Sequence, residues 1–148
     1  MFVKSFYIVI FLLFGNLLTF AQDDSEENVF SAQSSDSELR LEQNDLDFNA
    51  NFIDAIHLKS VDNYNKALEV LGKCEKIYPK NVGMLFEKAR NYAALNQFME
   101  ALHYCDKALQ VDSNNFWVKS LKRDVFLKQN NFTEALQIQK VLYEQKTN

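Results

Sequence analysis

The sequence predicts an all-α protein, a short α-solenoid of three helix-turn-helix repeats that follows a disordered acidic N-terminal tail. Three observations support this fold class. Only 3 Gly and 1 Pro occur among 148 residues, too few for a turn-rich β-sandwich or barrel. A 34-residue period runs through the chain after residue 47, and the acidic charge is concentrated before that point. Apolar residues make up 47% of the chain, which argues against wholesale disorder.

Residues 1–21 form the first element and have the pattern of a secretory signal peptide. Lys4 is followed by a long apolar stretch, and the small residues Thr19 and Ala21 precede an abrupt acidic turn in the sequence. We therefore expect cleavage after Ala21 and an exported protein, either periplasmic or secreted. The alternative is an uncleaved membrane anchor, because the apolar stretch is only slightly shorter than the roughly 20 residues that span a bilayer.

Residues 22–47 form the second element, a tail with nine acidic residues against Arg40 alone and a net charge of −8. Five of its residues are Ser and its only aromatic residue is Phe30, so it has little apolar surface to bury and is predicted to be a disordered tether. Only residues 39–46 have an apolar spacing that suits a helix. Residues 48–148 carry a net charge of +3, which would allow a weak, salt-sensitive contact with the tail; a solvated spacer is the favoured interpretation.

Three copies of one pattern organise residues 48–81, 82–115 and 116–148. Several columns of residues recur at intervals of 34: Asp62, Asn96 and Asn130; Tyr64, Phe98 and Phe132; Ala67, Ala101 and Ala135. Asp and Asn tolerate the left-handed backbone that ends a helix, so the first column predicts the turn within each repeat. The aromatic column is expected to be buried at this turn, and the small Ala residues let two antiparallel helices approach closely. Because each helix pair leaves apolar surface uncovered, neighbouring repeats must stack.

On these columns the chain from Phe48 to Asn148 resembles the tetratricopeptide repeat (TPR) family of 34-residue helix-turn-helix units. The middle repeat matches best, at Leu85, Ala89, Tyr92, Phe98, Ala101 and Ala108. The first helices of the outer repeats depart from the pattern, at Asn51, Asp54, Lys119, Lys122 and Arg123. Two registers therefore remain open there. In the second, shifted register the inward residues would be Phe52, Ile53, Ile56, Val118, Leu121 and Val125.

The resemblance implies a non-enzymatic module that binds a protein or peptide in a groove lined by the first helix of each repeat. Carried over by position, the predicted groove residues are Phe52, Ile56, Phe86, Arg90, Trp117, Ser120, Asp124 and Leu127. The family's subgroup that clamps a terminal carboxylate uses Lys, Asn and Arg at positions that here hold Phe52, Ile56, Glu87, Trp117 and Leu121. The groove is thus expected to suit apolar side chains, with Arg90 able to pair one carboxylate. The alternative places Phe52, Ile56, Trp117 and Leu127 in the core.

A second function hypothesis uses the last helix instead of the groove. The family usually finishes its arrays with an extra polar helix, and without one the last helix would leave an apolar edge that includes Leu136, Val141, Leu142 and Tyr143. This edge predicts weak self-association or docking on a partner. The chain would then be a structural or assembly subunit of a membrane-associated envelope complex.

Catalytic, metal and cofactor sites have no support in the sequence. His57 and His103 have no carboxylate or thiol at a useful spacing, and the three glycines stand apart rather than in a phosphate-binding loop. Cys74 and Cys105 fall at positions where small residues pack between helices, so both are expected to be buried thiols; a disulfide between them is the alternative. The mild overall charge of −4 gives no reason to expect a nucleic-acid partner.

Overall fold

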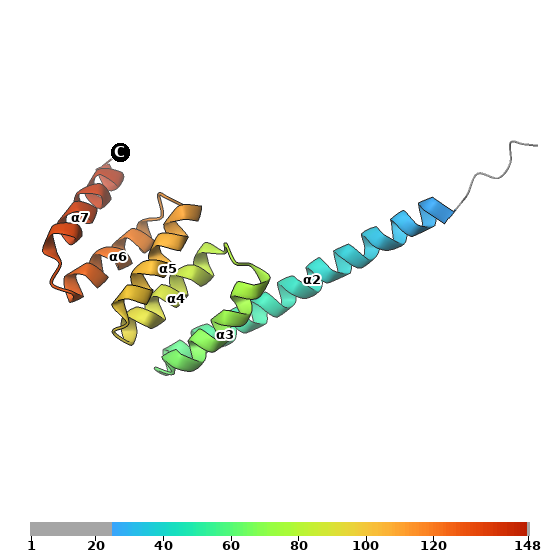
Figure 1. The fold of residues 1–148 in the computed structure, drawn as a ribbon, viewed down its shortest axis with the longest axis horizontal. Coiled ribbons are helices and arrows are strands. Elements are labelled where there is room, and N and C mark those ends of the chain that lie inside the picture. Colours follow the sequence, from blue (N-terminus) through green and yellow to red (C-terminus); the bar gives the residue numbers. More distant parts are fainter. Residues whose placement is uncertain (1–24, 148) are drawn as a thin grey trace, which may run out of the picture. The chain divides into compact units, whose positions relative to one another are not determined.

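A computed structural model describes residues 25–147, and the predicted signal peptide lies outside these residues. Every regular element in the described range is an α-helix, as predicted (Figure 1). The helices are α2 (Ser25–Ser60), α3 (Tyr64–Ile77), α4 (Val82–Ala94), α5 (Phe98–Val111), α6 (Phe116–Lys128) and α7 (Phe132–Thr147). None of the described helices is both long enough and apolar enough to cross a membrane. The chain divides into two compact units between Leu41 and Glu42, and the three repeats lie in the second.

The 34-residue period of the sequence recurs in the backbone. The turn inside each repeat holds a residue with a left-handed backbone, with φ of 60° at Asp62, 58° at Asn96 and 61° at Asn130. The prediction made from the Asp and Asn column is therefore confirmed. The second helix then begins two residues later, at the aromatic residue of the next column, in all three repeats.

The first helices of the second and third repeats begin at matching positions with the same cap. The Oδ1 atom of Asn81 accepts a hydrogen bond from the backbone N–H of Met84 at 2.9 Å, and that of Asn115 accepts one from Val118 at 3.1 Å. Such caps satisfy an N–H group that the first turn of a helix leaves unpaired. Because α4 and α6 start in step, the backbone of α6 keeps the common register. Val118, Leu121 and Val125, which the shifted register expected inward, nevertheless face the core.

The helix α2 begins well before the first repeat, which differs from the predicted disordered tail. Residues 25–47 are helical and continue without interruption into the repeat. The low apolar content of the tail limits what it can bury against other elements, but it does not prevent a helix. Residues 22–47 contain neither Gly nor Pro, and acidic residues interact favourably with the N-terminal end of a helix.

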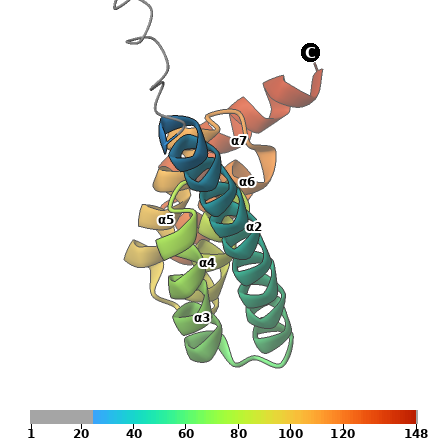
Figure 2. The same ribbon diagram turned by 90° about the vertical axis from the view of Figure 1, so that its right-hand side faces the viewer.

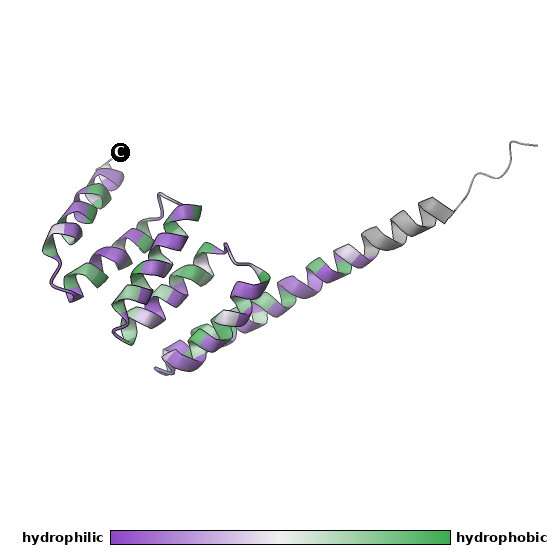
Figure 3. Cartoon of the chain, in the orientation of Figure 1, coloured by the Kyte–Doolittle hydropathy of each residue, from purple (hydrophilic) through white to green (hydrophobic). Residues whose placement is uncertain are grey.

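The core forms where the helices of successive repeats pack on one another. Within the second compact unit, the end of α2 lies beside α3, and the later helices follow in sequence (Figure 2). Both apolar and polar residues occur along each helix of the second unit, as expected when one face packs and the other meets solvent (Figure 3). The main cluster of buried residues joins α2 through α6 and contains Phe48, Ala55, Val70, Leu71, Cys74, Met84, Leu85, Ala89, Cys105, Ala108 and Val118.

Burial follows the place of a residue in the array as well as its type. Val118 and Val125 are buried and Leu121 is half-buried, because these residues of α6 face the second repeat. Ile53 was expected inside in the shifted register, yet it is 69% exposed. Phe132 was expected to be buried at its turn, and it is 63% exposed. Both exceptions lie on end repeats, where no neighbouring repeat covers them among the described residues.

The two cysteines provide a direct test of this core. Both are buried and free, and the Cys74 thiol donates to the backbone carbonyl of Phe48 at 3.8 Å. Burial raises the pKa of Cys105 to about 12, with a smaller contribution from Asp106, and burial also raises the pKa of Cys74. We expect both thiols to react with a disulfide reagent at least about a hundredfold more slowly in the native protein than after denaturation. Fast labelling of either thiol under native conditions would contradict the packing.

Candidate functional site

The first helices of the three repeats are connected through side chains that face one surface. Lys59 of α2 donates to Glu87 of α4 at 2.5 Å, and Arg90 donates to the other Glu87 oxygen at 2.9 Å. The carboxylate of Glu87 is 10% exposed and Lys59 is 17% exposed, so this ion pair is shielded from solvent. Farther along, α4 also contacts α6 directly. The three helices α2, α4 and α6 are therefore adjacent, as the groove prediction requires.

A cleft of about 550 Å³ lies between α4 and α6. We name it the α4–α6 cleft; it is lined by Phe86, Arg90, Phe116, Trp117, Ser120, Leu121, Arg123 and Asp124. It brings together five of the eight predicted groove residues: Phe86, Arg90, Trp117, Ser120 and Asp124. The indole of Trp117 is its most prominent feature, because this residue is 69% exposed and packs edge-on against Phe116 at a ring distance of 5.6 Å.

The charges of the α4–α6 cleft are already paired within the protein. Arg123 donates to Asp124 at 2.9 Å through Nε and at 2.6 Å through Nη2. Arg90 lies 5.6 Å from the centre of the Phe86 ring and donates to Glu87. The sequence prediction had Arg90 available to pair a ligand carboxylate, and the bond to Glu87 was not foreseen. A spacing of three residues on one helix is nevertheless usual for such a pair. The cleft thus presents aromatic surface with locally balanced charge.

The remaining predicted groove residues lie elsewhere. Phe52 is half-buried, stacks on Phe48 at a ring distance of 5.7 Å and packs against the core, and Ile56 is half-buried on the same helix. Neither residue lines the α4–α6 cleft. Trp117 and Leu127 are 69% and 44% exposed, so the alternative that placed them in the core does not hold.

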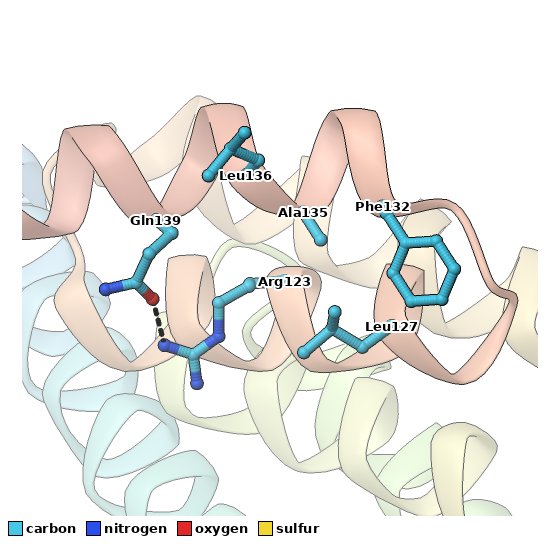
Figure 4. Close-up of a pocket in the computed structure, with 6 residues that line it drawn as sticks. All are labelled: Arg123, Leu127, Phe132, Ala135, Leu136 and Gln139. Carbon is cyan, nitrogen blue, oxygen red and sulfur yellow. Dashed lines mark hydrogen bonds between the residues drawn. The ribbon is translucent and has the colours of Figure 1, made fainter.

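Leu127 lines a different pocket, formed by α6 and α7 at the end of the array (Figure 4). This end pocket has a volume of about 490 Å³, and its walls are Arg123, Leu127, Phe132, Ala135, Leu136 and Gln139. Leu127 and Phe132 lie near each other at one side, and Arg123 donates to Gln139 at 2.8 Å at the other (Figure 4). Sequence reasoning expected an apolar edge on α7 but did not expect α6 to contribute to it.

A partly buried polar cluster on α3, α4 and α5 was also missed. Glu75 of α3 accepts from Lys88 and from Lys107, both at 2.5 Å, while the Lys88 ammonium group lies 4.4 Å from the centre of the Tyr104 ring. Burial acts to raise the pKa of Glu75, but the two lysine hydrogen bonds outweigh it and hold the pKa below its ordinary value. We name these residues the Glu75 cluster; they connect the first two repeats and have a structural role. Their partners come from three helices, so no spacing in the sequence signals them.

The histidines and acidic residues of the described helices lie apart from the α4–α6 cleft or in structural pairs. Within residues 25–147, no three His, Cys, Asp or Glu side chains are grouped so that they could hold a metal ion. His57 is exposed on α2, and the ring of His103 lies edge-on to Tyr104 at 5.3 Å. What the site presents is an accessible indole beside aromatic and aliphatic walls.

Similarity to known proteins agrees with this geometry. No protein-family model matches the chain. Solved TPR domains nevertheless superimpose on it, among them the Arabidopsis OM64 TPR domain, which is 16% identical with a TM-score of 0.63 and coverage of 68% of this chain and 84% of that one. The fold is the TPR fold. The family resemblance found in the sequence is thereby confirmed at the level of structure.

Two further TPR structures show the same likeness. MamA MSR-1 C2 is 21% identical with a TM-score of 0.62, covering 68% of this chain and 57% of that one. The first TPR of Spaghetti (RPAP3), bound to the HSP90 peptide SRMEEVD, is 17% identical with a TM-score of 0.64, covering 68% and 80%. In sequence, 53 residues are 43% identical to part of Sperm-associated antigen 1 of Rattus norvegicus; they cover 36% of this chain and 6% of that protein.

Proposed function

We propose that this TPR protein is a non-enzymatic adaptor or scaffold that is exported from the cell and binds a protein or peptide in the α4–α6 cleft. The exposed indole of Trp117 carries the proposal. Apart from its edge-on contact with Phe116, this side chain is 69% exposed and takes no part in the core. Trp is enriched among residues that dominate binding energy at interfaces. It stands on a helix that Val118 and Val125 anchor in the core, so the ring is presented from a rigid support.

The chemistry of the cleft favours a ligand with apolar or aromatic side chains. Phe86, Phe116 and Leu121 provide the walls, while the arginines are paired with Glu87 and Asp124. One similar TPR structure is bound to an HSP90 peptide, which supports peptide binding as a function for this fold. The mode of recognition should differ from a carboxylate clamp here, because Lys59 and Arg90 are already paired with Glu87 and are not free to bind a ligand's terminal carboxylate.

Export rests on the predicted signal peptide, residues 1–21, with cleavage after Ala21. The proposed location is the periplasm or the extracellular space, and a membrane-anchored form is the alternative if the leader is retained. Mass measurement of the N-terminus of the protein from its source distinguishes the two. The second candidate function, a subunit of an envelope assembly, is favoured by the apolar end pocket between α6 and α7.

Alanine substitution of Trp117 tests the cleft. A phage-displayed library of random linear peptides is selected on the full chain, and the affinity of a selected peptide is measured by isothermal titration. We expect Trp117→Ala to weaken binding by about 10- to 100-fold and to leave the melting temperature unchanged, because the removed ring is exposed. The matched control is Tyr143→Ala, which removes a 67% exposed aromatic side chain of α7 outside the cleft. Equal affinities for the two variants would contradict the proposal.

A further inference from the structure

The two ends of the array carry exposed faces that match each other. We define the start face as Ala50, Ile53, Asp54 and His57 of α2, all exposed. We define the end face as the pocket residues Leu127, Phe132, Ala135 and Leu136 together with Lys140. We propose that the start face of one copy docks on the end face of a second copy, so that the protein assembles head to tail. This inference goes beyond the proposed ligand cleft. None of the cleft residues belongs to either face, although Arg123 of the cleft also lines the end pocket.

The interface between the second and third repeats is the template for this contact. There, Val125 of α6 is buried against Ala93 and Ala101, and Leu121 packs on the same cluster. Phe98 and Leu102 complete the surface of the second repeat that α6 covers. The occupant of such a surface is therefore an α-helix that presents aliphatic residues from one side.

The 34-residue period maps the template onto the two end faces. The end-face residues Leu127, Phe132, Ala135 and Leu136 lie one period after Ala93, Phe98, Ala101 and Leu102, respectively. The start-face residues Ile53 and His57 lie two periods before Leu121 and Val125 of α6. Leu127 and Ile53 would then meet as Ala93 and Leu121 do inside the array. Most residues of both faces are exposed, with Ile53 69%, Phe132 63% and Leu136 58% exposed, while Ala135 lies buried at the base of the end face.

Charge complementarity favours a second copy over an unrelated helix. Inside the array, Lys122 of α6 pairs with Asp106 of α5 at 2.5 Å. One period after Asp106 stands Lys140, and two periods before Lys122 stands Asp54. The acid of the internal pair is thus replaced by a lysine and its lysine by an acid, so an Asp54–Lys140 pair between copies would again join opposite charges. Two faces that only met solvent would not need opposite charges at these matching positions.

Side-chain volume is complementary as well. Ala89 and Val118 both belong to the main core cluster. Their counterparts at the ends are Arg123 and Ala50. Arg123, which lines the pocket beside the end face, would therefore meet the small Ala50 of the start face, where the internal interface has a valine.

A contact of this kind is heterologous, because two different faces meet. A dimer formed in this way still has one free start face and one free end face, so further copies can add to it. The copies should therefore form open chains whose mean length grows with concentration. An isologous contact through α7 alone would stop at a dimer.

Sedimentation velocity of the full chain over a concentration series tests the proposal. We expect association that grows with concentration and passes beyond a dimer, and we expect Ile53→Asp and Leu136→Asp each to weaken it at least about tenfold. The matched control Met99→Asp alters a 72% exposed residue of α5 outside both faces and should associate like the wild type. Circular dichroism melting confirms that each variant is folded.

Mixing the two face variants provides the decisive arm. Ile53→Asp retains its end face and Leu136→Asp retains its start face, so an equimolar mixture should form dimers and nothing longer. In the same way, Asp54→Lys and Lys140→Glu should each weaken association by about two- to fivefold, and both changes in one chain should restore it. The proposal is overturned if the wild type remains monomeric up to about 1 mM, if Ile53→Asp has no effect, or if the mixture fails to form dimers.

Discussion

Replacing Leu71 with alanine is expected to lower the free energy of unfolding by about 3 kcal/mol. Leu71 of α3 is fully buried, at 0% exposure, within the cluster that joins α2 through α6. Truncation removes apolar contacts and leaves a cavity, and Leu to Ala changes in such sites cost about 2–5 kcal/mol. Leu71 lies between the first two repeats. The substitution should therefore weaken the packing of these repeats on each other as well as the packing of α3.

Urea denaturation followed by far-UV circular dichroism measures this effect. The matched control is Leu136→Ala, the same change at a leucine that is 58% exposed. In dilute protein it should shift the free energy of unfolding by no more than about 0.5 kcal/mol. Similar losses in both variants would mean that α3 does not pack between its neighbours as described.

The second large effect is expected from Glu75→Gln, which should cost about 2–3 kcal/mol. The substitution keeps the shape of the side chain but removes the negative charge that Lys88 and Lys107 share. The Lys88 side chain is 7% exposed, so its ammonium group would remain in the protein interior without a counter-charge. Glu75 itself is 22% exposed, which keeps the expected cost below that of a fully buried pair.

Asp106→Asn is the control for this experiment. It makes the same change of acid to amide in the ion pair between Asp106 and Lys122. The Asp106 side chain of this pair is 52% exposed. A pair in solvent contributes less than about 1 kcal/mol. If the control proves as costly as Glu75→Gln, burial of the Glu75 cluster is not what makes it important.

The same cluster predicts a dependence on pH. The pKa of Glu75 is held below its ordinary value of 4.5 in the folded protein, since the lysine hydrogen bonds outweigh the opposing effect of burial. Its contribution to stability is therefore complete above that ordinary value and is lost as the pH falls through the lower, folded pKa. Between neutral pH and about pH 3, Glu75→Gln should lose less stability than the wild type. An equal loss would show that the carboxylate titrates as it does in the unfolded chain.

The period of 34 residues made most of the fold predictable. Asp62, Asn96 and Asn130 predicted the turns because few residues other than Gly accept a left-handed backbone, and all three have it. The small residues Cys74 and Cys105 were expected inside, and both are buried. These predictions succeeded because each depends on one residue type in one local setting.

Predictions of burial that depended on neighbours came closer where the neighbour exists. Phe98 and Phe132 occupy the same position, but Phe98 is half-buried against the cluster that contains Val125 of α6, whereas Phe132 remains 63% exposed. The helical start of α2 was missed for a different reason, since low apolar content limits tertiary burial but does not prevent a helix without Gly or Pro. Sequence position alone cannot show which surface the array leaves open.

The candidate site was predictable in outline and not in its charges. The family positions located the aromatic residues of the α4–α6 cleft, including Trp117 and Phe86. They did not reveal that Glu87 binds Arg90 and Lys59, or that Arg123 lines both the cleft and the end pocket. The Glu87–Arg90 pair has a spacing visible in the sequence, whereas the Lys59–Glu87 pair and the place of Arg123 depend on which side chains of different helices converge.

The most direct test of the binding cleft uses the fluorescence of Trp117, the single tryptophan of the chain. Its indole is 69% exposed, so the free protein should emit at the long wavelength of a hydrated ring. Titration with a selected peptide that contains no tryptophan should shift the emission to shorter wavelength, in step with the binding isotherm from titration calorimetry. A peptide that binds with full affinity while the emission of Trp117 stays unchanged would contradict the account, because its site would then lie outside the α4–α6 cleft.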